Sequence, residues 1–600
     1  MKSNLFTQRW STSRYPNRLF LAAFGLLNLL FFLPFYLLNR EDTALFPVTE
    51  VFGWDWWTDL QRLFLWRNNV DPFRWNIELI VLVALWVNVR HLRRPLFRIL
   101  LIALYFLMLF YYLYEAITIS VYQVDPIFYH HYYLALDGLH FLLEHLHLSA
   151  GLYLGALLLT VLALLTVYGM AQMLYNISLA DRLSPWLRLS FGMVAVVMLS
   201  ATVAYQTVLA VPTMVVSSLF YKVEKNVQKS FQVYREVSAF DDTQLRQVYN
   251  YRDQTLGRKP NIYLIFIESY GSVLYRRPDY KVGYELLLKK LEAQLSAGGW
   301  HATSTLSDSP TWGGGSWLAY TSTLFGLRID THPQFLALLN KYQVDTYPNL
   351  GNYLKAQGYR YYHLSSLSSE LPESDWRKQE RFYGVDHWFR FEELDFHGPM
   401  YGWGPAPPDQ YALHATHERL TQESNQPFLL FFITQNSHYP FAPLPNLVDD
   451  WRTLNNHDAS PPSIDADGIT HDERRRNYAE AIQYELAMLS EFVLTAGGDN
   501  DLFIFIGDHQ PPRVSRRDDS FATPVHIVSR DQHLITTFQQ VGFVPGLRVT
   551  DLTPTMKHEG FYSLLVRTLM ETYGVGDKAA LPVYLPNGFI DQQSALKIQP

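Results

Sequence analysis

The sequence predicts two successive folds: an α-helical transmembrane bundle of five spans, followed by an α/β domain built on a parallel sheet. The first third of the 600 residues is crowded with long apolar runs, whereas the rest has the composition of a water-soluble protein. About 20 apolar residues are needed to cross a bilayer, and the early runs approach or exceed that length. From residue 260 on, short apolar runs alternate with helical patterns, which is typical of a parallel sheet covered on both faces.

Residues 1–213 are expected to form the membrane domain. The second of its spans is the shortest and carries Asn76, Glu78 and Asn88. The first span is followed by LNREDT and has no small-residue cleavage site, so we interpret it as an anchor rather than a removed signal peptide. The five spans are predicted near 18–39, 75–92, 97–118, 149–172 and 189–213.

Basic residues predict how the bundle is oriented. Lys and Arg occur before the first span, between the second and third spans and between the fourth and fifth, whereas residues 119–148 contain none. The positive-inside rule therefore places the N-terminus in the cytoplasm. Five spans then place the C-terminal domain outside the cytoplasm, while an even number would place it inside.

Residues 214–259 are mixed and charged, and we expect amphipathic linker helices there. The domain at 260–600 has helix-like stretches at 284–296, 347–357, 411–423 and 473–495. The predicted strands are PNIYLIFIESYG, RYYHLSS, PFLLFFITQNSH, DLFIFIGDH and TPVHIVSR.

Composition excludes some classes of function. The formal net charge is −7 and no dense Lys/Arg stripe appears, which argues against a nucleic-acid partner. The chain has no cysteine, so disulfides and thiolate metal sites are excluded.

Polar residues follow three of the predicted strands. Glu268 ends the first, His438 follows PFLLFFITQNS, and Asp508 and His509 follow DLFIFIG. A polar turn at each strand end is the alternative, but ligands of open α/β sheets bind beyond the carboxyl ends of the strands. Two carboxylates and an imidazole suit Mn²⁺, Zn²⁺ or Mg²⁺. Three such endings on one edge therefore favour a shared metal site.

The segment SDSPTWGGGSWLAYTSTLFGL (307–327) supplies candidate nucleophiles. Thr311 is preferred, and Ser309 and Ser316 are the alternative hydroxyls. The glycines let backbone N–H groups approach an anion, and the N-terminus of the helix expected next favours phosphate. A hydroxyl bound to a divalent metal loses its proton more readily and can attack phosphorus. A flexible Gly-rich loop without chemistry is the alternative interpretation.

The motifs IFIESYG, SPTWGGGSW, NSHYPF and IGDHQ occur in this order with large gaps. Together they resemble the lipoteichoic acid synthase group of the alkaline phosphatase/sulfatase superfamily, and the Gly-rich motif is more similar to the Gram-negative members. The resemblance implies about five membrane helices and a sulfatase-like domain on the periplasmic side of a bacterial inner membrane.

The resemblance also implies roles for single residues. Glu268, Asp508 and His509 would bind one divalent metal ion, with Mn²⁺ the leading choice and Zn²⁺ or Mg²⁺ the alternatives. Thr311 would be both nucleophile and fourth ligand, and His438 would contact the phosphate or the leaving group. Substrate-binding candidates are Trp403 and Asp409 in YGWGPAPPDQYAL, and Trp376 with Arg377 or Arg381 in DWRKQERFYGVDHW.

The implied reaction moves phosphoglycerol from phosphatidylglycerol, through a phospho-threonine, to an envelope glycan or glycolipid. Phosphoethanolamine transfer is the first alternative, but those relatives carry disulfides and a Gly-Glu-Thr triplet where this chain reads IES. A sulfatase proper would need a Cys/Ser-x-Pro-x-Arg motif, which does not surround Thr311. A phosphoester hydrolase, with water as acceptor, and a non-catalytic membrane scaffold are the remaining alternatives.

Overall fold

The computed structural model forms two compact units, Met1–Ser120 with Asp125–Gln232, and Val121–Val124 with Val233–Pro600. Each is described by itself. The structure describes residues 15–39, 74–134, 150–204, 216–368, 371–402, 404–423, 425–457, 469–516, 519–575 and 581–590.

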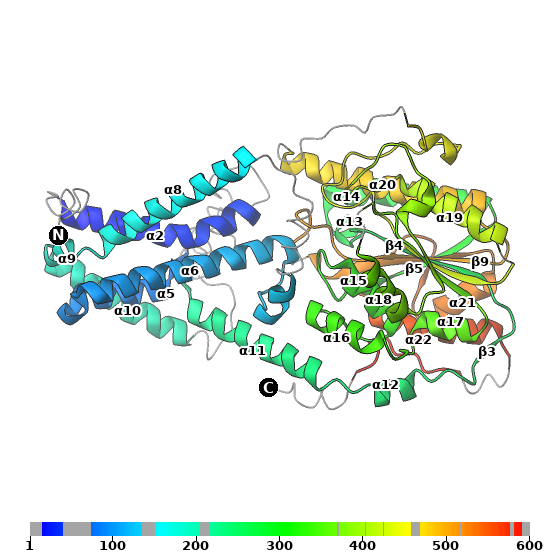
Figure 1. Cartoon of the computed structure of the whole chain (residues 1–600), viewed down its shortest axis with the longest axis horizontal. Helices are drawn as coiled ribbons and strands as arrows, with labels where there is room; N and C mark the ends of the chain where they lie inside the picture. Colours follow the sequence, from blue (N-terminus) through cyan, green and yellow to red (C-terminus); the bar gives the residue numbers. More distant parts are fainter. Residues whose placement is uncertain are drawn as a thin grey trace. The chain divides into compact units, whose positions relative to one another are not determined.

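Among the described residues of the first unit, four helices are long and apolar enough to cross a membrane. They lie close to the first, third, fourth and fifth predicted spans and run beside one another in Figure 1. Their bounds are α2 (Pro16–Asn39), α6 (Pro95–Tyr122), Leu157–Asp181 from within α8 (Ala150–Leu174) through α9 (Ile177–Asp181), and α10 (Pro185–Ala204).

The second predicted span differs from the prediction in length. Helix α5 covers only Ile77–Asn88, which at 1.5 Å per residue is about 18 Å and shorter than a bilayer core. The chain enters it through strand β1 (Trp75–Asn76), which pairs in parallel with β2 (Val216–Ser217). The side chain of Asn76 caps the helix by accepting a hydrogen bond from the N–H of Leu79. Asn76, one of the polar residues that made this span less apolar than the others, therefore begins the helix as its N-cap.

The region at 216–259 lies within the predicted linker. It contains α11 (Leu219–Ser238) and α12 (Thr243–Val248). After these helices, β3 (Thr255–Leu256) pairs with β13 (Gly574–Val575) in a two-stranded sheet. This sheet connects the segment before β4 with the C-terminal part of the second unit.

A nine-stranded sheet forms the centre of the second unit. Its strand order is β11-β5-β10-β9-β4-β8-β6-β7, with β12 paired to β5. Strands β9, β4, β8, β6 and β7 are parallel neighbours, so their carboxyl ends share one edge. The strands are β4 (Asn261–Ile267), β5 (His301–Asp308), β6 (Arg360–Leu364), β7 (His387–Phe389), β8 (Phe428–Ile433), β9 (Asp501–Gly507), β10 (Ala522–Ser529), β11 (Val544–Pro545) and β12 (Met556–Lys557).

The sheet is mixed rather than parallel throughout. Strand β10 runs antiparallel to both β9 and β5. The sequence HATSTLSD of β5 was not predicted as a strand because it is polar, although most of it is buried. Its hydroxyls find partners inside the fold: Ser304 contacts His526 Nδ1 at 2.7 Å, and Ser307 contacts His558 Nδ1 at 2.9 Å.

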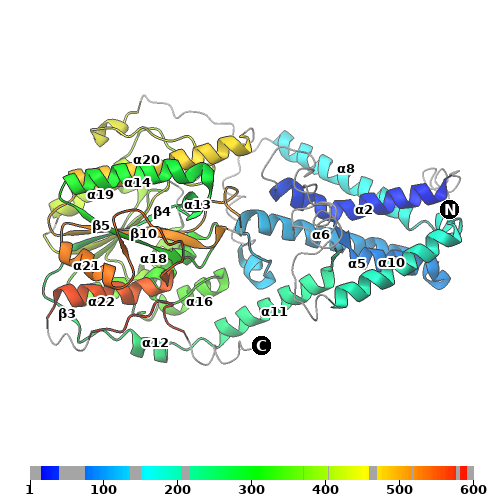
Figure 2. The ribbon, with the colours of Figure 1, turned by 180° about the vertical axis from the view of Figure 1, so that it is seen from behind.

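Helices cover both faces of the sheet (Figures 1 and 2). Alternate residues of β4 serve two cores: Ile262, Leu264 and Phe266 face one, while Tyr263 and Ile265 face the other. The first core includes residues of α15 (Ser316–Phe325), α16 (His332–Tyr342), α17 (Leu350–Ala356), α18 (Glu373–Tyr383), α21 (Gln532–Gln540) and α22 (Phe561–Tyr573), and the second includes residues of α13 (Val273–Arg276), α14 (Pro278–Ala297), α19 (Asp409–Glu423) and α20 (His471–Ala496).

Candidate metal centre and active site

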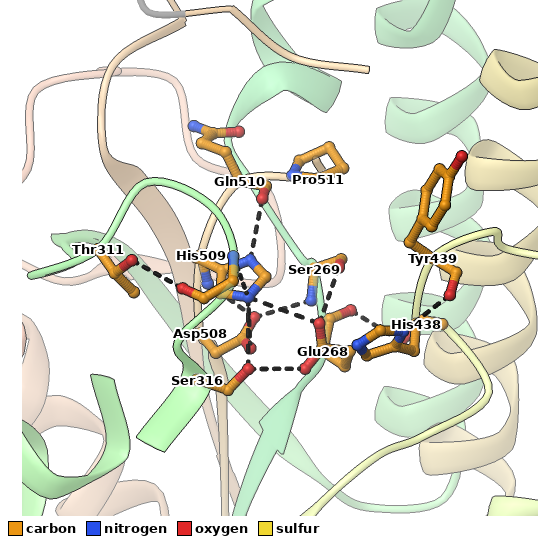
Figure 3. A network of polar contacts seen from close by, with 12 residues as sticks. Glu268, Ser269, Thr311, Ser316, His438, Tyr439, Asp508, His509, Gln510 and Pro511 are labelled. Atoms are coloured by element: carbon orange, nitrogen blue, oxygen red, sulfur yellow. Dashed lines mark hydrogen bonds and ion pairs between the residues drawn. The ribbon is translucent and has the colours of Figure 1, made fainter. Parts of the chain in front are cut away.

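Glu268, Asp508 and His509 meet at the carboxyl edge of the sheet (Figure 3). Glu268 follows β4, and the other two follow its parallel neighbour β9. One ligand atom from each lies within 4.8 Å of the others, and all three side chains are buried. His509 Nε2 lies 3.3 Å from Asp508 Oδ2 and 3.5 Å from Glu268 Oε1. The structure thus brings together three of the four residues that were predicted as metal ligands; the fourth is Thr311.

The donor set fits a divalent cation. Asp508 Oδ1 accepts hydrogen bonds from the backbone N–H groups of Ser269 and His509, each at 2.7 Å. Its Oδ2 is buried and receives no hydrogen bond from the residues that the structure describes. A buried carboxylate oxygen without a donor is costly unless a cation compensates it. With Glu268 and His509 beside it, this oxygen marks a candidate site for a divalent metal ion.

The charges of the site are strongly coupled. Burial and the neighbouring charge of Glu268 hold the pKa of Asp508 well above its usual range. Burial also favours neutral Glu268, but the positive charges available at His509 and His438 outweigh it and lower the Glu268 pKa. Burial lowers the pKa of His509, against the pull of Glu268. Among the described groups, His509 and His438 therefore supply too little positive charge to keep both carboxylates ionised.

The ring of His509 is oriented by a backbone contact. Its Nδ1 donates to the carbonyl of Gln510 at 2.9 Å, which leaves Nε2 as the acceptor and potential ligand atom. That Nε2 accepts a hydrogen bond from the N–H of Gly314 at 3.0 Å. The Gly-rich loop is therefore attached directly to the candidate metal centre.

The loop presents two hydroxyls in different ways (Figure 3). Ser316 Oγ donates to Glu268 Oε2 at 3.0 Å and lies 3.3 Å from His509 Nε2. Thr311 Oγ1 donates instead to the carbonyl of Gly314 at 2.7 Å. Gly314 and Gly315 both have positive φ, a conformation that favours glycine, and Gly315 is the N-cap of α15. Ser316 is therefore delivered to the site as the first residue of the helix.

The other alternative hydroxyl, Ser309, has a structural contact. Its Oγ donates to the carbonyl of Asp508 at 2.6 Å and accepts the N–H of Thr311 at 3.3 Å. Ser309 therefore joins the end of β5 to the end of β9 and points its hydroxyl at backbone.

His438 lies beside Glu268 on the segment after β8 (Figure 3). Its Nδ1 donates to the carbonyl of Tyr439 at 2.8 Å. The same segment holds the backbone of Glu268 from both sides. Ser437 Oγ donates to the Glu268 carbonyl at 2.7 Å, and Thr434 Oγ1 accepts the Glu268 N–H at 3.1 Å.

Trp376 and its predicted arginines lie in another setting. Trp376 is buried against Trp388, with ring centroids 5.3 Å apart, and it lines a pocket of about 420 Å³. The guanidinium over its ring belongs to Arg390, at 4.8 Å, which the sequence argument missed. The exposed Arg377 pairs with Glu373, and Arg381 donates to the Arg377 carbonyl. Their predicted role in headgroup binding stays a prediction.

The two remaining substrate-binding candidates have different outcomes. Trp403 lies outside the described residues. Asp409 begins α19 and is fully buried, with Oδ2 accepting the N–H groups of Gln435 and Asn436 at 2.7 Å each. In this structure Asp409 thus holds backbone, and its predicted contact with substrate stays untested.

A family model described as Sulfatase matches residues 321–535, which include the strands that carry His438, Asp508 and His509. This part of the chain therefore resembles a sulfatase domain. The predicted sulfatase-like fold is confirmed, and with it the order of a helical membrane unit followed by an α/β domain. No curated protein matches the chain significantly.

Solved structures with low identity resemble the sulfatase-like domain. The lipoteichoic acid synthase LtaP from Listeria monocytogenes is 14% identical over 56% of this chain and 79% of its own, with a TM-score of 0.35. Lipooligosaccharide phosphoethanolamine transferase A from Neisseria meningitidis is 11% identical over 53% of this chain and 91% of its own soluble domain, with a TM-score of 0.34.

Proposed function

We propose that this protein is a membrane-bound, metal-dependent phosphotransferase that moves a phospholipid headgroup to a cell-envelope glycan or glycolipid. Phosphatidylglycerol is the proposed donor and phosphoglycerol the group transferred. The observation that carries the proposal is the contact of the Ser316 hydroxyl with Glu268 and His509, beside the buried Asp508 oxygen that lacks a donor. A nucleophile, an acceptor for its proton and a cation site lie in one place.

The proposed attacking group is the Ser316 hydroxyl, with Thr311, the residue favoured by the sequence, as the alternative. Ser316 Oγ forms a bond to phosphorus as the bond from phosphorus to the diacylglycerol oxygen breaks. The hydroxyl proton passes to Glu268 Oε2, which already accepts its hydrogen bond. His438 donates a proton to the departing diacylglycerol oxygen, and a phosphoserine intermediate remains.

The second half returns the enzyme to its starting state. A hydroxyl of the acceptor loses its proton to His438 and attacks the phosphoserine. Ser316 is released and recovers its proton from Glu268. The N-terminus of α15, where Ser316 is the first residue, favours the negative charge of the phosphoryl group in both steps.

Glu268, Asp508 and His509 would hold the metal ion, with Mn²⁺ proposed and Zn²⁺ or Mg²⁺ as alternatives. When bound, the ion would favour the deprotonated hydroxyl and neutralise phosphoryl charge. The rest of the arrangement comes from the chain: Ser309 and Gly314 fix the loop, and Thr434 and Ser437 fix Glu268.

Headgroup-labelled donors test this function. Purified protein is incubated briefly with vesicles containing labelled phosphatidylglycerol or labelled phosphatidylethanolamine, without acceptor. We expect label from phosphatidylglycerol on the protein, and faster donor consumption when a glycan or glycolipid acceptor is added. Label from phosphatidylethanolamine alone would replace the proposed donor. Release of free glycerol phosphate at a rate that no acceptor changes would make the protein a hydrolase.

A further inference from the structure

A second pair of buried carboxyl groups lies outside the metal centre. Asp409 is the first residue of α19, and Glu485 lies in the middle of α20. Both are fully buried, and each affects the ionisation of the other. A hydrogen bond between two acids requires a proton on one of them, because ionised carboxylates only accept.

The pair is attached to the segment that carries His438. Asp409 Oδ2 accepts the N–H groups of Gln435 and Asn436, and the Asp409 N–H donates to Asn436 Oδ1 at 2.8 Å. Since Thr434 and Ser437 bind the backbone of Glu268, two successive hydrogen bonds separate Asp409 from a predicted metal ligand. Residues 434–438 are therefore fixed between the acid pair and the metal centre.

No positively charged group among the described residues stabilises either carboxylate of the pair. Asp409 Oδ1 and both carboxyl oxygens of Glu485 are buried and have no hydrogen-bond partner in the described part of the chain, although the Ser437 N–H lies near Glu485. Tyr484 of α20 interacts with both carboxyl groups and with Tyr401. Further away along the same helices, Glu491 of α20 contacts His414 of α19, and His438 and Glu268 lie at the metal centre. Two ionised carboxylates in such a place would repel each other at low dielectric.

The electrostatics agree with the geometry. Burial raises the pKa of Asp409 to about 6. Burial and the adjacent charge of Asp409 raise the pKa of Glu485 well above its usual range. Two coupled acids of this kind release their protons in two separate steps.

We propose that Asp409 and Glu485 share one proton and act as positioning residues, which hold residues 434–438 and so place His438 and Glu268. When the pair holds one proton, Asp409 is ionised and accepts the N–H groups of Gln435 and Asn436, and protonated Glu485 donates a hydrogen bond to Asp409. Loss of the second proton would bring two like charges together, and movement of the 434–438 segment would relieve their repulsion. The effect of the pair on headgroup transfer rests on the function proposed above, whereas the shared proton and the placement of residues 434–438 do not.

Hydrogen exchange of the full chain in detergent tests the pair without substrate or turnover. Protection factors of peptides covering 434–438 are measured from pH 6 to pH 10. In the wild type we expect them to fall by about tenfold per pH unit between the ordinary pKa of a carboxyl group and the raised pKa of the pair, and to level off above it, since one pKa unit corresponds to 1.36 kcal/mol. Glu485→Gln, whose amide donates to Asp409 at every pH, should keep its protection.

Tyr484→Phe is the matched control, because it changes the neighbouring residue of α20 and leaves both carboxyl groups in place; it should follow the wild type. If Glu485→Gln does not fold, Asp409→Asn is measured instead, since it also leaves one ionisable group, and the same pH-independent protection is expected. The proposal is overturned if the folded variant loses protection in parallel with the wild type, or if the wild type shows no loss. None of these outcomes depends on which lipid is the donor.

Discussion

Ser316 Oγ donates a hydrogen bond to Glu268 Oε2 at 3.0 Å, across 48 residues of chain. Glu268 directly follows β4, whereas Ser316 is the first residue of α15 beyond the Gly-rich loop. The contact joins a predicted metal ligand to a hydroxyl. It distinguishes Ser316 from Thr311 as candidate nucleophiles, a choice that the sequence left open. It explains why α15 starts where it does: the left-handed Gly315 turns the chain so that Ser316 meets the strand end.

The first prediction concerns the nucleophile. Ser316→Ala removes the hydroxyl that contacts Glu268 and His509, so turnover should fall by roughly 10⁴-fold or more, as for other covalent nucleophiles. Intact-mass spectrometry after brief exposure to donor lipid should show an added headgroup phosphate on the wild type and none on this variant. Thr311→Ala is the matched control from the same loop and should still form the adduct. If Thr311→Ala abolishes the adduct and Ser316→Ala keeps it, Thr311 is the nucleophile.

The second prediction concerns the metal. Asp508→Ala removes the buried oxygen that has no donor, and Glu268 with His509 alone would leave a divalent ion under-coordinated. Elemental analysis of the purified variant should show a large loss of bound metal. Asp499→Ala, at an exposed carboxylate shortly before β9, should retain the wild-type content. Full occupancy in Asp508→Ala would remove Asp508 from the set of ligands.

The third prediction concerns the close packing of Gly507, the residue just before Asp508, against neighbouring backbone. A Cβ at Gly507, the last residue of β9, would overlap with the backbone carbonyl oxygen of Tyr270. Gly507→Ala should therefore destabilise the protein by about 3 kcal/mol, as overpacking does when backbone must shift. Urea unfolding of the full chain in detergent measures this. Gly283→Ala adds the same methyl group on the open surface of α14 and should be neutral or stabilising, and equal effects at both glycines would contradict the argument.

The fourth prediction concerns topology. The loop charges place the sulfatase-like domain outside the cytoplasm, provided that the short α5 and its flanking extended residues complete a fifth crossing. A reporter that is active only in the cytoplasm, fused after Pro600, should be silent, while the same reporter fused after Arg94 should be active. Activity at Pro600 would mean that α5 does not complete a crossing.

The sequence determined much of this protein because its signals are local. Apolar runs of membrane length predicted five spans, and four helices among the described residues are long and apolar enough to cross a membrane. The strands that precede Glu268 and Asp508 were visible as apolar segments that stop at acids. Parallel strands with carboxyl ends on one edge then required Glu268, Asp508 and His509 to converge, and the structure confirms that they do.

Only the tertiary structure decided the rest, because distant residues determine it. The polar strand β5 is stable because hydroxyls such as those of Ser304 and Ser307 meet partners far along the chain. The sequence alone shows that Glu485 has the spacing of a core residue in α20. Its partner Asp409 lies 76 positions earlier, so the pair becomes apparent only when the helices pack. Likewise, three hydroxyls shared one Gly-rich segment, and the backbone conformation of that loop directs Ser309 and Thr311 to carbonyl oxygens and Ser316 to Glu268.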